Sequence, residues 1–144
     1  MHTQSFEEVT QAIVDLLKEH QDDLGLKDVW YGDQELIPRT PAVAVESGSK
    51  TRELTGAPDV TTNRFTVFVL TYMAKIQDVQ TTRKMADQLA EAIELLLHDD
   101  TTIGGLVIFG MCTSVEPGYA IRGGTLMRAA RITWEGFTKL RMGA

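Results

Sequence analysis

The segment of residues 61–75 limits the possible folds of this chain most, because it has the pattern of a long β-strand with two apolar faces. Side chains alternate between the faces of a strand. Both alternating sets are apolar here: Phe65, Val67, Val69 and Met73 on one face, and Phe68, Leu70 and Tyr72 on the other. One face can pack against helices of the same chain. The other requires a second layer or a neighbouring subunit.

Two amphipathic helices are predicted, over residues 5–21 and 78–98. Ser5 followed by Glu8 is typical of a capping box, and Asp78 is a favourable N-cap. Apolar residues then recur at helical spacing in both segments. The first stripe is Phe6, Val9, Ile13, Leu16 and Leu17, and the second is Met85, Leu89, Ala92, Ile93 and Leu96.

Three further strands are predicted, over residues 42–46, 106–116 and 126–138. Gly123-Gly124 indicates the tip of a hairpin between the last two strands. Pro117-Gly118 is expected to end the first strand of that hairpin. In the last strand the expected apolar face is Leu126, Ala130, Ile132 and Trp134.

Two segments beside the strand of residues 42–46 are expected to lie outside the sheet. Residues 26–41 are predicted to be an irregular connector, because Pro38 and Pro41 exclude a central strand. Residues 47–60 have no long apolar period and are predicted to form a long loop or extended arm.

A chain of 144 residues is expected to form a single domain, residues 1–144. The element order predicts an α+β fold, α-β-β-α-β-β. We expect a four-stranded, mainly antiparallel sheet packed by two helices, with the arm between the first two strands. Trp134 and Phe68 are the expected core or interface anchors.

The sequence contains no recognisable catalytic constellation. Its three histidines are far apart, and His98-Asp99-Asp100 is better explained as a helix terminus than as a metal cluster. The single cysteine, Cys112, is expected to be a buried, inert thiol. We therefore expect no enzyme activity, no catalytic residue, and no cofactor or metal site.

The charge is distributed unevenly along the chain. Residues 1–60 contain 12 acidic and 5 basic side chains, whereas residues 61–144 contain 8 and 9. The net charge of −6 argues against a dedicated nucleic-acid-binding protein. The longest apolar runs are only a few residues long, so no membrane span is expected, and no signal peptide is visible.

Two sequence stretches carry a resemblance to a known family. They are Pro-Arg-Thr-Pro-Ala-Val-Ala-Val at residues 38–45 and the Asp-initiated helix containing Ala-Asp-Gln-Leu-Ala-Glu-Ala-Ile at residues 86–93. With the strand Arg-Phe-Thr-Val-Phe-Val-Leu-Thr-Tyr between them, the pattern resembles the tail terminator and related neck, minor tail or head–tail joining proteins of long-tailed bacteriophages. The likeness extends from about Phe6 to Leu140.

The resemblance implies a structural virion protein that assembles in the host cytoplasm. It implies a homohexameric ring that caps the tail tube, ends tube polymerisation and joins the tail to the head. Implied partners are other copies of the chain, the tail tube protein and a head-completion or neck protein, with the C-terminus of the tape-measure protein as a further candidate. An adaptor ring elsewhere in the neck is the alternative within this class.

On this hypothesis the arm and the basic last strand are contact surfaces. Their candidate partner-interface residues are Lys50, Arg52, Leu54, Arg122, Arg128 and Arg131. An acidic lumen would let DNA pass without adhering. A different class also stays open: a small α+β ligand-binding module with a pocket lined by Trp30, Tyr31 and Tyr119.

Overall fold

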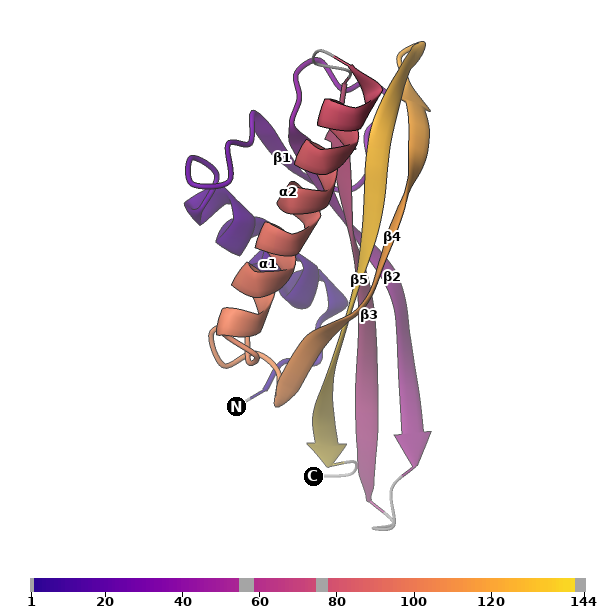
Figure 1. Ribbon diagram of the computed structural model, residues 1–144. Coiled ribbons are helices and arrows are strands. Elements are labelled where there is room, and N and C mark those ends of the chain that lie inside the picture. The colour runs from indigo at the N-terminus through magenta and orange to yellow at the C-terminus, as the bar shows by residue number, and fades with distance from the viewer. Residues whose placement is uncertain (1, 55–58, 75–77, 142–144) are drawn as a thin grey trace.

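The fold is a single strongly twisted β-sheet with both helices on one of its faces (Figure 1). The computed structural model describes residues 2–54, 59–74 and 78–141. The elements follow the order α1 (Phe6–Glu19), β1 (Asp28–Tyr31), β2 (Ala42–Leu54), β3 (Val60–Met73), α2 (Val79–Asp99), β4 (Phe109–Arg122) and β5 (Thr125–Arg141).

The sheet has five strands in the order β1-β2-β3-β5-β4. Strands β1 and β2 are parallel, and the other neighbouring pairs are antiparallel. The α+β class with two helices agrees with the prediction. The predicted four-stranded, mainly antiparallel sheet and the order α-β-β-α-β-β are wrong: the sheet is mixed, and the order is α-β-β-β-α-β-β.

The missed strand is β1, within the predicted connector. Its residues pair from Asp28 with Ala42 to Tyr31 with Val45. The prolines do exclude a central strand, but β1 lies at the sheet edge and ends before Pro38. Four residues rich in β-branched and aromatic side chains are enough for an edge strand.

The predicted arm of residues 47–60 is largely part of a β-hairpin. Residues 47–54 continue β2 and pair with β3 as far as Leu54 with Thr61, while residues 55–58 lie outside the described part of the chain. A register shift between Ser47 and Ser49 interrupts the pairing at Gly48. A Cβ added to Gly48 would lie 2.8 Å from the Phe68 ring, so glycine fits this position. The outer half of this hairpin extends past the helices (Figure 1).

Both helices begin directly after their predicted N-cap residues, Ser5 and Asp78. Ser5 Oγ accepts from the Glu8 backbone N–H at 3.2 Å, and the Asp78 carboxylate accepts from that of Thr81 at 2.8 Å. The Glu8 carboxylate accepts instead from the Thr3 hydroxyl, so the capping box at Ser5 is not reciprocal. Within the described residues, neither helix is both long and apolar enough to cross a membrane.

Both faces of β3 pack against apolar side chains, but the cluster on one face is much larger than that on the other. Its helix-facing side chains belong to the main core, which includes Phe65, Val67, Val69 and Met73. On the opposite face, Tyr72 belongs to a smaller cluster with Ile37, Ala42, Ala44 and Met127. The second layer required by the sequence is therefore supplied at one end by the connector between β1 and β2.

The β4–β5 hairpin is longer than predicted. Gly123 and Gly124 form its tip with positive φ angles of 58° and 79°, as expected. Strand β4, however, continues past Pro117 to Arg122. Proline is tolerated because β4 is an edge strand, where the missing N–H can face solvent and no hydrogen bond between strands is lost. Leu126, expected in the apolar face, is 61% exposed.

Candidate functional site

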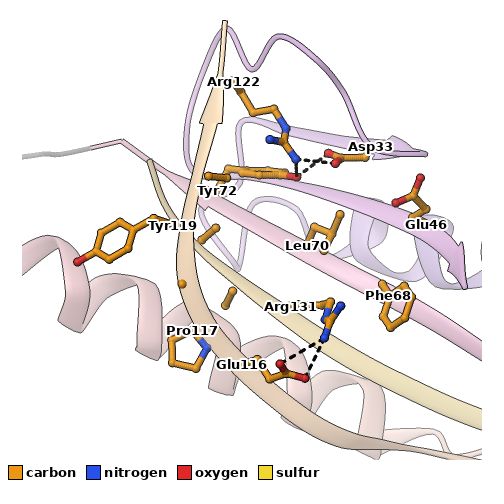
Figure 2. Close-up of a pocket in the computed structure, with 14 residues that line it drawn as sticks. Asp33, Glu46, Phe68, Leu70, Tyr72, Glu116, Pro117, Tyr119, Arg122 and Arg131 are labelled. Carbon is orange, nitrogen blue, oxygen red and sulfur yellow. Dashed lines mark hydrogen bonds and ion pairs between the residues drawn. The ribbon is translucent and has the colours of Figure 1, made fainter. Parts of the chain in front are cut away.

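A hollow lies on the sheet face opposite the helices, where strands β3, β5 and β4 twist beneath the β1–β2 connector (Figure 2). Its volume is about 500 Å³. Phe68 and Leu70 form an apolar floor, and charged side chains stand at both ends. We call this region the open face.

One end of the open face is closed by Asp33, Tyr72 and Arg122. The Tyr72 hydroxyl donates to Asp33 Oδ1 at 2.5 Å, and Arg122 Nη2 donates to Asp33 Oδ2 at 2.7 Å. Arg122 also donates to the Tyr72 oxygen at 3.1 Å. The cluster joins the connector, β3 and the tip of the β4–β5 hairpin. Beside it, the Gly123 backbone N–H donates to the Glu35 carbonyl at 2.9 Å.

Burial and hydrogen bonding in this cluster shift the pKa values of Asp33 and Tyr72. Burial raises the pKa of Asp33, but the hydrogen bonds from Tyr72 and Arg122 outweigh it, so the pKa lies below the ordinary 3.8. Burial and the hydrogen bond to Asp33 raise the pKa of Tyr72 well above its usual range. At neutral pH, Asp33 is therefore a carboxylate and Tyr72 a neutral phenol.

The other end of the open face is held by Arg131. Its Nη2 lies 3.1 Å and 3.2 Å from the two carboxylate oxygens of Glu116, and its guanidinium lies 5.1 Å from the centroid of the Phe68 ring. The Glu46 carboxylate also borders the hollow and makes no ion pair among the described residues. Arginine and aromatic residues over an apolar floor are typical of protein–protein contacts.

The six predicted interface residues do not form one patch. Lys50 Nζ donates to the Gln4 carbonyl at 2.5 Å, which ties the N-terminal segment to β2. Arg52 Nε donates to Asn63 Oδ1 at 3.0 Å within the β2–β3 hairpin. Leu54, near the end of that hairpin, is 86% exposed. The three remaining arginines each lie over an aromatic ring: Arg122 over Tyr72, Arg128 over Tyr119 and Arg131 over Phe68.

The sequence reasoning missed Asp33 and Tyr72 as site residues. Asp33 and Arg122 are 89 positions apart, and only the folded sheet brings them together. The alternation along the strand places Tyr72 on an apolar face, which is correct for its ring but does not account for its hydroxyl. No local motif indicates this cluster.

The three aromatic residues proposed to line a ligand pocket do not converge. Trp30 borders a hollow beside the connector, whereas Tyr119 points across β4 toward α2 (Figure 2). Tyr31 is 44% exposed at the edge strand β1. The geometry therefore gives no single aromatic pocket to the ligand-binding alternative.

His98 and Cys112 are structural neighbours. The Cys112 backbone N–H donates to His98 Nε2 at 2.9 Å, so this ring nitrogen is an acceptor. Burial, together with the nearby Glu94 carboxylate, raises the pKa of the Cys112 thiol to about 12. The thiol is buried and protonated at neutral pH, as expected for an inert cysteine. In the part of the chain that the structure describes, no three His, Cys, Asp or Glu side chains group as metal ligands.

Comparison of the sequence with protein-family models and with curated proteins gives no match.

Proposed function

We propose that this chain is a structural virion protein of a long-tailed bacteriophage. It forms a homohexameric ring that caps the tail tube, ends tube polymerisation and joins the tail to the head. A neighbouring adaptor ring of the neck is the second form of the same proposal. It rests on the sequence resemblance and on the surfaces described above.

The observation that carries the proposal is the outer half of the β2–β3 hairpin. Nearly all side chains of β2 beyond its register shift are exposed, on both faces of the strand, and Leu54 near the tip is 86% exposed. A strand with two exposed faces contributes little to the core of its own domain. Its position beyond the helices suits contact with the tube below or with a neighbouring subunit (Figure 1).

The charge distribution fits a ring through which DNA passes. The outward face of α1 and the turn after it carry exposed acidic residues, Glu7, Asp15, Glu19, Asp22 and Asp23. The arginines of the open face are paired with carboxylates instead. In the proposed ring the α1 surface faces the lumen, where like charge keeps DNA phosphates from adhering.

The ring itself is the first prediction. Native mass spectrometry or mass photometry of the purified protein, alone and mixed with tail tube protein, should show hexamers. Negative-stain images should show rings of the same stoichiometry. A chain that stays strictly monomeric in both conditions contradicts the proposal.

A second prediction concerns the β2–β3 hairpin. Replacing residues 53–62 by Asn-Gly keeps the Arg52–Asn63 pair and closes the strands with a short turn. We expect the variant to keep its fold and its ring but to lose joining to the tube, because the exposed end of the hairpin is gone. Circular dichroism measures the fold, and electron microscopy of assembled tails measures joining.

Gly124→Asn at the tip of the other hairpin is the control, since a Cβ there meets no atom within 4 Å and asparagine tolerates a positive φ angle better than most residues. It should assemble normally. If the shortened hairpin still yields tails of normal length that join heads, the hairpin is not the contact. If tail length is normal and only head joining fails, the neck-ring form of the proposal is favoured.

A further inference from the structure

A second, smaller hollow lies on the helix side of the sheet, between the first turns of α2 and the β4–β5 hairpin. Its volume is about 260 Å³, and its lining includes Val79, Thr82, Leu126 and Met127. Val79 and Leu126 are 52% and 61% exposed, so the hollow is open and apolar. Pockets for small molecules usually enclose about 300–1,000 Å³. This hollow lies just below that range, and it has room for a large apolar side chain.

Two arginines flank this hollow, and both are held by Tyr119. Arg83 donates to the Tyr119 hydroxyl oxygen from Nη2 at 2.6 Å and from Nε at 3.1 Å. The Arg128 guanidinium lies 4.9 Å from the centroid of the same ring. The hydrogen bond from Arg83 also lowers the pKa of Tyr119. We call the hollow and its two arginines the socket.

Among the described residues, no carboxylate is paired with the two arginines of the socket. Across residues 2–54, 59–74 and 78–141, neither Arg83 nor Arg128 forms an ion pair. Arg128 Nε is buried without a hydrogen-bond partner among those residues. The nearby Asp78 carboxylate caps α2 by accepting from Thr81. A buried donor without a hydrogen-bond partner costs free energy.

The complement of the socket lies farther along the same helix. Leu95 is 70% exposed, although it is a large apolar residue on a helix. Glu91 and Asp99 precede and follow it by four residues, so both lie on its face of the helix. Neither carboxylate forms an ion pair in the described part of the chain. We call these three residues the knob.

We propose that the knob of one copy of this chain enters the socket of the next copy in the ring. Leu95 fills the apolar hollow, and Glu91 and Asp99 pair with Arg83 and Arg128. This inference deepens the proposed function and rests on it, because it names the contact that builds the ring.

The geometry of the two surfaces supports a contact between copies. Arg83 and Leu95 are 12 residues apart on α2, about 18 Å along the helix axis at about 1.5 Å per residue. The knob and the socket are therefore different surfaces, and their contact is head-to-tail. Such a contact produces a ring when its rotation closes.

The charges also match in number. Two acidic residues flank the apolar side chain of the knob, and two arginines line the apolar hollow of the socket. The guanidinium carbons of Arg83 and Arg128 lie 5.9 Å and 4.9 Å from the centroid of the Tyr119 ring, so both positive charges lie beside this one ring.

Charge reversal tests this contact. Both R83E/R128E and E91R/D99R should lower the association constant between subunits by at least about 100-fold, because each places like charges against one another. Mixing the two variants should restore hexamers, since acidic knobs then meet basic sockets and basic knobs meet acidic sockets. Native mass spectrometry should show the restored rings to contain the two variants in equal numbers.

Controls separate this contact from the ring proposal. K18E reverses an exposed charge on α1, outside the knob and the socket, and should assemble as the wild type does. Leu95→Asp, which leaves every hydrogen bond of the socket in place, should also weaken assembly. If the wild type forms hexamers and the reversed variants do so equally well, the knob–socket contact is wrong while the ring stands. A wild type that remains monomeric with the tube protein overturns both.

Discussion

Replacing Trp134 with alanine should lower the free energy of unfolding by about 3–5 kcal/mol, the usual effect of truncating a buried aromatic residue. Trp134 is fully buried in the main core, between the helices and the sheet. Its ring occupies a slot formed by Gly110 and Gly136, which face each other on β4 and β5. Denaturation by urea, followed by circular dichroism, measures the change.

The two glycines provide a specific control for this packing. A Cβ on Gly110 would lie 2.1 Å from Trp134 Cζ2, and one on Gly136 would lie 2.3 Å from Cη2. Gly136→Ala should therefore destabilise the wild type but have little effect in the Trp134→Ala background, because the clash disappears with the ring. Additive effects of the two substitutions, or an unchanged midpoint for Trp134→Ala, would show that the ring does not occupy this slot.

Trp134 and Phe68 were indistinguishable as anchors in the sequence, and the structure separates them. Phe68 is only partly buried on the open face, beneath Arg131. Alternation along a strand predicts which residues share a face, but it does not say which face the helices cover. That choice depends on the sheet as a whole, so single-strand patterns could not settle it.

Local signals predicted the elements whose causes are local. Ser5 and Asp78 begin the helices because their side chains accept backbone N–H groups within one turn. The Gly123-Gly124 tip requires positive φ angles, which glycine adopts readily. These features depend on a few neighbouring residues, so they can be inferred without a sheet order.

Long-range pairing accounts for what the sequence could not predict. Strand β1 exists only because β2 offers a parallel edge, and a four-residue segment carries too weak a pattern alone. Pro117 would end a central strand, but β4 is an edge strand and continues past it. The basic residues of β5 are visible in the sequence, but their aromatic partners come from strands β3 and β4.

Replacing Asp33 with asparagine should lower the free energy of unfolding by about 1–3 kcal/mol at pH 7, because Arg122 is then left half-buried without its counterion. The pKa of Asp33 in the folded chain lies below its ordinary value of 3.8. Its carboxylate therefore contributes stability above that value, and the contribution is lost as the pH falls through the lower, folded-state pKa. Urea unfolding at pH 7 and below pH 4 measures the difference between wild type and variant.

Asp28→Asn is the matched control, because Asp28 also pairs with an arginine, but Arg39 is 62% exposed. An exposed pair of this kind contributes about 0–1 kcal/mol, so the control should change stability little. For Asp33→Asn, the difference in the free energy of unfolding between the variant and the wild type should become smaller as the pH falls and the wild-type carboxylate becomes protonated. If this difference is the same at pH 7 and below pH 4, the charge of Asp33 does not hold Arg122 in place. In that case the Gly123–Glu35 backbone hydrogen bond and the Tyr72–Asp33 hydrogen bond would have to fix the connector over the hairpin tip.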